Sequence, residues 1–144
     1  AWAPRPVQVA TARWLRDRDS WQSWHETMLE DTRSRLDELH HGIQAMKADG
    51  LPVDSIEPQG AIYISVRFGL VGMRTPTGKV LENNEDIRSY LLQEAAFAVV
   101  PFSAFGVEEH DEDGWSRASV GAISHEGIRA ALPRLRAAME ALTR

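Results

Sequence analysis

The most regular pattern in the chain is an apolar stripe between residues 21 and 48, a stretch with no proline and with Gly42 as its only glycine. The stripe consists of Leu29, Leu36, Leu39, Ile43 and Met46. Because these positions follow spacings of three and four, they predict a long amphipathic helix. Ser20 is its predicted cap and Asp49-Gly50 its stop. A shorter helix is predicted before it, from Pro6 to the charged run at 16–19.

Strict alternation identifies the clearest strand, over residues 61–68. Ile62, Ile64, Val66 and Phe68 alternate there with more polar positions. This period of two predicts a half-buried strand. Residues 53–57 predict a short edge strand before it, and the glycine-containing stretch 69–81 predicts a long loop or loose hairpin.

The remaining chain predicts a helix, two strands and a closing helix. Asn84 is the predicted cap of a helix running to about Ala96, followed by a strand over 97–101. A loop, a strand carrying Arg117 and a helix capped by Ser124 follow. Pro133 predicts a kink or a restart near Ala131 in that last helix, because an interior proline costs about 3 kcal/mol.

This order of elements predicts one domain of the α+β class, with helices packed on a small, largely antiparallel sheet. The length of 144 residues suits one domain with a real core, and 43% hydrophobic and 26% charged residues are ordinary for a globular protein. A net charge of -5 with dispersed basic residues argues against nucleic acid, and no apolar run predicts a membrane span. The lack of cysteine excludes disulfides, zinc-cysteine sites and thiol nucleophiles, and fits a cytoplasmic protein.

Arg117 is the strongest candidate for function. It lies on a predicted short strand directly after a loop. A guanidinium presents a planar fork of donors that matches a carboxylate or phosphate, so we predict an acidic small molecule as its ligand. The alternative is a surface ion pair. In the preceding loop, Phe105 is interpreted as the wall of a pocket and Phe102 as a residue that closes the core.

Other patterns predict no catalytic group and no metal site. The glycines of 72–79 lack the spacing of a phosphate loop, and Val80 stands where a magnesium-binding hydroxyl is needed. The acidic run 108–113 lacks the spacing of a calcium loop and is interpreted as solvated. Around His25 and His125, no arrangement of Ser or Asp suggests a triad.

The N-terminal region is unusually rich in tryptophan. Four tryptophans fall in the first 24 residues, which predicts packing against another domain or subunit. The chain begins Ala1-Trp2-Ala3 without an initiator methionine, so we expect a piece of a longer polypeptide.

Several short motifs together resemble one family over nearly the whole chain. They are Gln59-Gly60-Ala61-Ile62-Tyr63, Val99-Val100-Pro101, Ser103-Ala104-Phe105-Gly106, Arg117-Ala118-Ser119 and Ser124-His125-Glu126-Gly127-Ile128. Their order and spacing resemble the C-terminal small domain of class I/II, fold type I, aminotransferases that depend on pyridoxal 5'-phosphate (PLP). The resemblance implies that residues 1–18 form a helical segment leading from a missing large domain. Residues 19–144 would then be the small domain.

The resemblance also implies roles for individual residues. Arg117 matches the arginine that grips the α-carboxylate of the amino acid and of the 2-oxo acid, and Ile64 matches an active-site apolar position. The catalytic lysine of the family has no match, since Lys47 and Lys79 lack the surrounding motif. No catalytic or cofactor-binding residue is therefore expected in this chain. PLP would be bound mainly by the large domain, the parent would be a homodimer, and the chain alone would be inactive.

Two alternatives remain open at this stage. Other fold type I enzymes, such as acyl-CoA-dependent synthases, lyases and decarboxylases, share this small domain, so a carboxylate clamp does not identify the reaction. The second alternative is a non-catalytic carboxylate-binding or dimerisation module.

Overall fold

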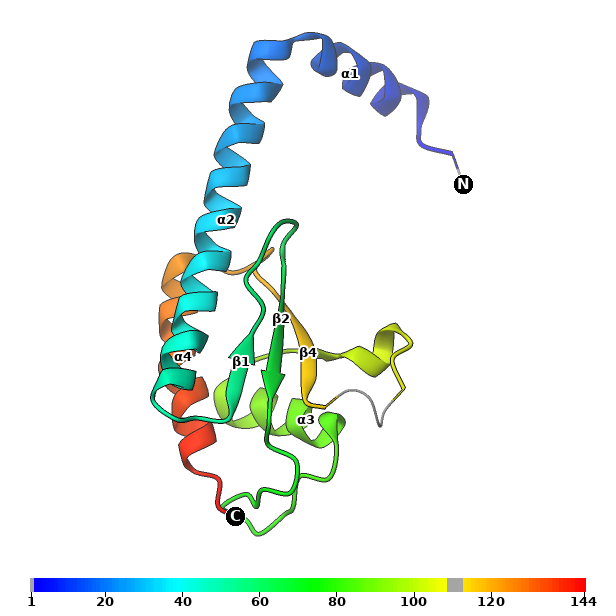
Figure 1. The fold of residues 1–144 in the computed structure, drawn as a ribbon. Helices are drawn as coiled ribbons and strands as arrows, with labels where there is room; N and C mark the ends of the chain where they lie inside the picture. Colours follow the sequence, from blue (N-terminus) through cyan, green and yellow to red (C-terminus); the bar gives the residue numbers. More distant parts are fainter. Residues whose placement is uncertain (1, 109–112) are drawn as a thin grey trace.

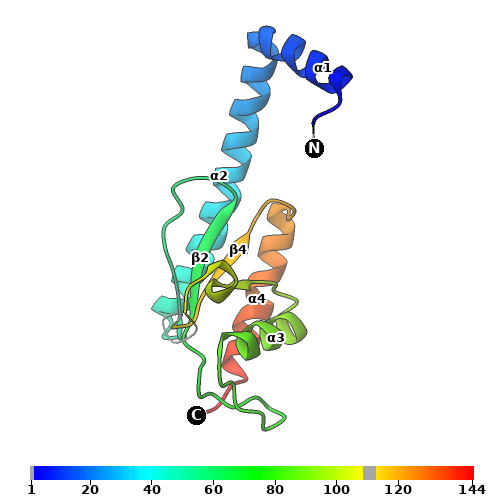
Figure 2. The ribbon, with the colours of Figure 1, turned by 90° about the vertical axis from the view of Figure 1, so that its right-hand side faces the viewer.

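Helices cover one face of a small antiparallel sheet in the computed structural model, which describes residues 2–108 and 113–144 (Figures 1 and 2). The elements are α1 (Arg5–Arg16), α2 (Arg18–Ala48), β1 (Val53–Ser55), β2 (Tyr63–Phe68), α3 (Asn84–Ala95), β3 (Val100–Pro101), a short 3-10 helix η1 (Phe102–Phe105), β4 (Trp115–Ser119) and α4 (His125–Glu140). The predicted α+β class is confirmed.

The sheet has the strand order β1-β2-β4-β3, and every neighbouring pair is antiparallel. In the central pair, Ile64 lies opposite Ala118 and Ser65 lies opposite Arg117. Side chains of a strand alternate between its two faces. Ile64 and Ala118 therefore point to the face covered by the helices, where both are buried. Ser65 and Arg117 point to the opposite face, which we call the open face.

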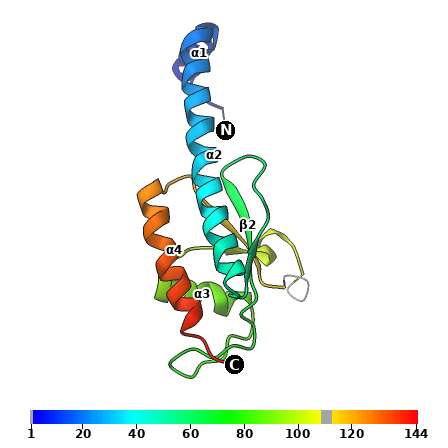
Figure 3. The same ribbon diagram turned by 60° about the vertical axis from the view of Figure 1, so that its left-hand side comes forward.

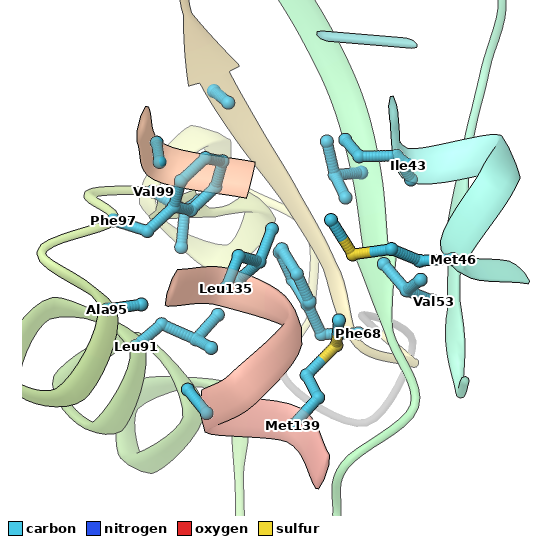
Figure 4. Close-up of a cluster of buried hydrophobic side chains, with 14 of the residues drawn as sticks. Ile43, Met46, Val53, Phe68, Leu91, Ala95, Phe97, Val99, Leu135 and Met139 are labelled. Carbon is cyan, nitrogen blue, oxygen red and sulfur yellow. The ribbon is translucent and has the colours of Figure 1, made fainter. Parts of the chain in front are cut away.

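The core forms where α2, α3 and α4 meet the helix-covered face. Figure 4 shows Phe68 of β2 surrounded by side chains from all three helices, including Met46, Leu91 and Leu135. Phe68 is fully buried and meets the edge of the Phe97 ring, with the two centroids 6.3 Å apart. This packing fixes the orientation of β2, because each buried position of the strand is enclosed by helices.

The N-terminal arm, residues 5–31, extends beyond this core (Figures 1 and 3). No residue of α1 is buried, and Thr32 is the first buried residue of α2. The arm nevertheless carries apolar side chains, and Trp24 is 57% exposed. Trp14 and Trp24 pack edge to face across the joint between the helices, with ring centroids 6.0 Å apart. The arm therefore presents an apolar surface that the described residues do not cover.

Two of the three predicted helix caps differ from the structure. The long helix begins at Arg18 with Asp17 as its cap, so the prediction of Ser20 is wrong: a single residue separates α1 from α2. The cap of α3 is Asn83, which accepts a hydrogen bond from the backbone N–H of Asp86, and the prediction of Asn84 is wrong by one position. Ser124 is confirmed as the cap of α4, since its side chain accepts from Gly127 N–H.

The last helix passes through Pro133 as a single helix, so of the predicted kink or restart near Ala131 the restart is wrong. A proline in a helix leaves the carbonyl four residues earlier without its usual partner. That carbonyl belongs to Arg129, and both Arg129 and Pro133 are exposed. Water can therefore satisfy the carbonyl, and the helix continues.

Strand β3 is shorter than predicted, with only Val100 and Pro101 paired to β4. The reason lies at the end of α3. Ala96 adopts a left-handed conformation with φ of 50°, and the N–H of Phe97 donates to the carbonyl of Leu91. Phe97, the first residue of the predicted strand, therefore belongs to the C-terminal cap of α3.

The return of the chain into β4 depends on Gly114. Its φ is +82°, and a Cβ added there would lie 2.3 Å from the carbonyl oxygen of Phe68. The carbonyl of Gly114 also accepts a hydrogen bond from Phe68 N–H at 3.0 Å. We predict that Gly114→Ala lowers the free energy of unfolding by about 2–5 kcal/mol in urea denaturation, because backbone strain and a steric clash add.

Gly78→Ala is the matched control. Gly78 has a φ of +89°, but nothing lies within 4 Å of its added Cβ. Only strain applies there, about 1–2 kcal/mol. Equal losses for the two variants would contradict the proposed close approach at Gly114.

Candidate functional site

Arg117 lies in the middle of β4, half-buried, with its side chain on the open face of the sheet. Its direct neighbours across the strands are Ser65 on β2 and Val100 on β3. Neither neighbour carries a charge. The strand pairing that positions Arg117 therefore supplies no counter-ion.

Two aromatic rings contact the guanidinium. The Cζ atom of Arg117 lies 4.2 Å from the ring centroid of Tyr63 and 4.0 Å from that of Phe105. Tyr63 belongs to β2 on one side of β4, and Phe105 ends η1, which follows β3 on the other side. We call these three residues the Arg117 stack. Each such contact stabilises by about 0.5–1 kcal/mol at an exposed site, and it leaves the N–H donors free because they lie in the guanidinium plane.

No residue that the structure describes neutralises the charge of Arg117. Within residues 2–108 and 113–144, its guanidinium has no carboxylate partner and no hydrogen bond. Arg67 on the same face of β2 is different, since its Nε and Nη2 donate to both carboxylate oxygens of Asp113, at 3.1 and 2.9 Å. A fixed guanidinium with free donors is suited to bind a flat anion in two parallel hydrogen bonds.

The structure brings together two of the three site residues expected from sequence. Arg117 and Phe105 are in contact, but Ile64 is 2% exposed and lies on the helix-covered face. Sequence reasoning missed Tyr63, which contacts Arg117 in place of Ile64. The signal was available in the alternation of β2, since the residue next to a buried position of a strand points to the other face.

His125 has partners that the sequence did not suggest. Its Nε2 lies 3.4 Å from the hydroxyl of Ser34, and its Nδ1 contacts the carboxylate of Glu38, residues that lie 91 and 87 positions earlier. Glu38 also accepts a hydrogen bond from Arg129, and the hydrogen bonds from His125 and Arg129 lower the pKa of its carboxyl. A distance of 3.4 Å is long for a hydrogen bond from a hydroxyl. We interpret the group as a contact that holds the first turn of α4 against α2.

A separate hollow of about 490 Å³ lies between α2 and the turn before β2. Its lining includes Thr32, Leu36 and Gly60, with the charged pair Arg33 and Asp37 at its rim. These two charges lie 3.9 Å apart, with Arg33 exposed and Asp37 half-buried. The hollow therefore lacks the combination of a free charge and fixed rings that is found at Arg117.

Neither metal binding nor a membrane span is supported by the part of the chain that the structure describes. No group of three or more histidine, aspartate or glutamate side chains is placed there to hold a metal ion. The acidic run 108–113 lies largely outside the described residues. Among the described helices, none is both long and apolar enough to cross a membrane.

Comparison with known proteins gives a consistent match. The family described as aminotransferase class I and II matches residues 1–135. An aspartate aminotransferase of Rhizobium meliloti (strain 1021) is 33% identical over 139 residues, which is 96% of this chain and 32% of that protein. An aromatic-amino-acid aminotransferase of Thermococcus litoralis is 30% identical over 135 residues, 90% of this chain and 28% of that protein.

The solved structures agree. The crystal structure of the aspartate aminotransferase from Rhizobium meliloti matches with a TM-score of 0.67 and 34% identity, covering 79% of this chain and 26% of that one. The chain spans about a third of the length of the curated relatives it matches.

We predict that Arg117 contributes little to stability. Arg117→Leu should lower the free energy of unfolding by no more than about 1–2 kcal/mol, because it removes only the two ring contacts. Arg35 is the control, since its Nη1 donates to the carbonyls of Val120 and Ile123 at 2.7 and 2.9 Å. Arg35→Leu should cost more, about 2–4 kcal/mol, because it leaves both carbonyls without this donor. Urea denaturation measures both, and a larger loss for Arg117 would indicate a structural role.

Proposed function

This chain belongs to the aminotransferase class I and II family, and from that premise we propose that it is the substrate-clamping small domain of a longer PLP-dependent aminotransferase. In this proposal Arg117 binds the α-carboxylate of the amino acid and of the 2-oxo acid. The observation that supports it is a guanidinium that contacts two rings on the open face of the sheet and has no acidic partner in the part of the chain that the structure describes.

The clamp acts by orientation. A carboxylate held by two parallel hydrogen bonds has a fixed plane, so the Cα of the substrate points in one direction from the sheet. Correct orientation of a bound substrate supplies a large share of the rate enhancement of such enzymes. Arg117 is suited to this because β4 is a central strand, and the two rings restrict the motion of its guanidinium.

The two relatives named above act, by their names, on aspartate and on aromatic amino acids. These substrates differ in the side chain and share the α-carboxylate. Arg117 would therefore serve any amino donor, and the selection among donors would depend on residues outside the clamp. Both relatives are aminotransferases, which favours this reaction over the synthase, lyase and decarboxylase alternatives.

The family implies PLP as cofactor, which supplies an electron sink for amino-group transfer when it is bound. The described residues do not fit a site for it. The ammonium group of Lys47 lies 2.7 Å from the carboxylate of Asp54, whose pKa is lowered to about 2 chiefly by hydrogen bonds from Lys47 and Gln44. Lys79 is paired in the same way with Asp86. Neither lysine is free, so we propose that residues outside this chain hold the cofactor.

The rest of the active site would come from a large domain and a second subunit. Tyr63 and Phe105 are 41% and 49% exposed, whereas substrate sites are normally enclosed, so another surface should close over the Arg117 stack. The apolar arm is suited to contact such a surface. We propose that residues 1–18 lead from the large domain, that 19–144 form the small domain, and that the whole enzyme is a cytoplasmic homodimer.

The central test is a substitution of Arg117 in the full-length protein, assayed with L-aspartate and 2-oxoglutarate and then with other amino donors. Arg117→Gln should lower kcat/KM about a hundredfold or more, because about 3 kcal/mol of charged hydrogen bonding is lost. Arg117→Lys should recover only part of this, since it restores the charge without the planar fork. Arg67→Gln is the matched control. Arg67 lies on the same face, but its charge is already paired with Asp113, so this substitution should change kcat/KM less than about threefold. Full activity of Arg117→Gln would refute the clamp.

A second test concerns the chain without the rest of the enzyme. Mixed with PLP, L-aspartate and 2-oxoglutarate, it should form no oxaloacetate above the rate with PLP alone. Borohydride reduction followed by mass spectrometry should find no stoichiometric attachment of the cofactor to Lys47 or Lys79. Turnover that requires either lysine would show that the chain holds its own cofactor site.

A further inference from the structure

The rings of the Arg117 stack hold the guanidinium, and they also restrict the shape of the anion that can reach it. Rings from opposite sides of β4 stand at 4.2 and 4.0 Å from Cζ. The N–H donors point outward in the guanidinium plane. With one ring on each side of Cζ, the space left for an anion at the guanidinium lies between the two rings.

A carboxylate and a tetrahedral anion differ in this approach. A carboxylate is flat, so both of its oxygens can lie in the guanidinium plane and accept one hydrogen bond each. A phosphate or sulfonate group always has oxygens above or below that plane. Those oxygens would meet the rings, whose faces carry negative charge density and repel anions.

Among the described residues, the strand neighbours of Arg117 supply no second positive charge that would offset this restriction. The neighbours of Arg117 across the strands, Ser65 and Val100, are uncharged. Arg67 donates to both carboxylate oxygens of Asp113 and so offers no competing anion site. Selection at the stack therefore depends on shape.

We infer that Tyr63 and Phe105 are specificity-determining residues, which make Arg117 select flat carboxylates over tetrahedral oxyanions. This inference rests on the proposed function, because it assumes that Arg117 binds a carboxylate. Inorganic phosphate is a tetrahedral competitor for any free arginine. By disfavouring phosphate, the two rings keep Arg117 available for the carboxylate of the substrate.

The test compares acetate with methanesulfonate, two monoanions that carry the same methyl group and differ in a flat or tetrahedral head. Each is titrated into the 144-residue chain at constant pH and ionic strength, and NMR follows the Nε–H signal of Arg117. The ratio of the two affinities is compared with that in Tyr63→Leu and Phe105→Leu. Because both head groups keep their basicity in every variant, a change in the ratio of the two affinities measures the effect of the rings.

The inference predicts that acetate binds the unaltered chain more tightly than methanesulfonate. In each leucine variant the ratio should fall at least threefold, and in Tyr63→Phe, which keeps the ring, it should be retained. The Nε–H signal of Arg67 is the internal control and should respond to neither anion. Amide spectra establish that each variant is folded, which is expected since neither Tyr63 nor Phe105 is a core residue.

Three outcomes would overturn the inference. Equal affinity of the unaltered chain for the two anions overturns it without any variant. An unchanged ratio in both leucine variants overturns the role of the rings while leaving the carboxylate site intact. If the Arg117 signal does not respond to acetate at all, the proposed function fails, and the inference fails with it.

Discussion

The antiparallel register between β2 and β4 is the constraint on which the candidate site depends. It places Ser65 opposite Arg117 and Ile64 opposite Ala118, so one set of residues faces the helices and the other faces outward. A shift by one residue would exchange the two sets. Arg117 would then enter an apolar core as an unpaired charge, which is strongly unfavourable. The core packing around Phe68 and Ile64 therefore maintains the position of Arg117, although Arg117 lies on the other face of the sheet.

The elements around this pair complete the site in different ways. Arg35 of α2 donates to two carbonyls in the turn after β4, which secures the strand beyond its end. The 3-10 helix after β3 brings Phe105 over the guanidinium from the opposite side to Tyr63. A rigid strand thus carries the charged group, and a short loop element supplies one of its walls. This division is common in binding sites, because the scaffold maintains the geometry while loops shape the pocket.

The sequence predicted the features that depend on local patterns. The apolar stripe of α2, the alternation of β2 and the cap at Ser124 are all visible in short windows. The cap is confirmed, and so are the stripe and the alternation except at Leu29 and Ile62, which are exposed. Features that depend on contacts between distant segments were missed. Tyr63 is a different case: the alternation of β2 already places it on the other face from Ile64, and only its contact with Arg117 on the neighbouring strand required the structure. The partners of His125 lie on another helix, and Pro133 is tolerated because its surroundings are exposed. That Arg117 has no acidic partner among the described residues also required the structure, since the sequence of a strand is the same whether or not an acid lies beside its arginine.

The central claim is that Arg117 holds a substrate carboxylate, and the most direct measurement is a crystal structure of the full-length protein with bound succinate, which has carboxylates but no amino group. The account predicts that one carboxylate of succinate lies in the plane of the Arg117 guanidinium, accepting two hydrogen bonds between the rings of Tyr63 and Phe105. Succinate bound in the active site through other groups, with Arg117 paired to an acidic side chain of the protein, would contradict it.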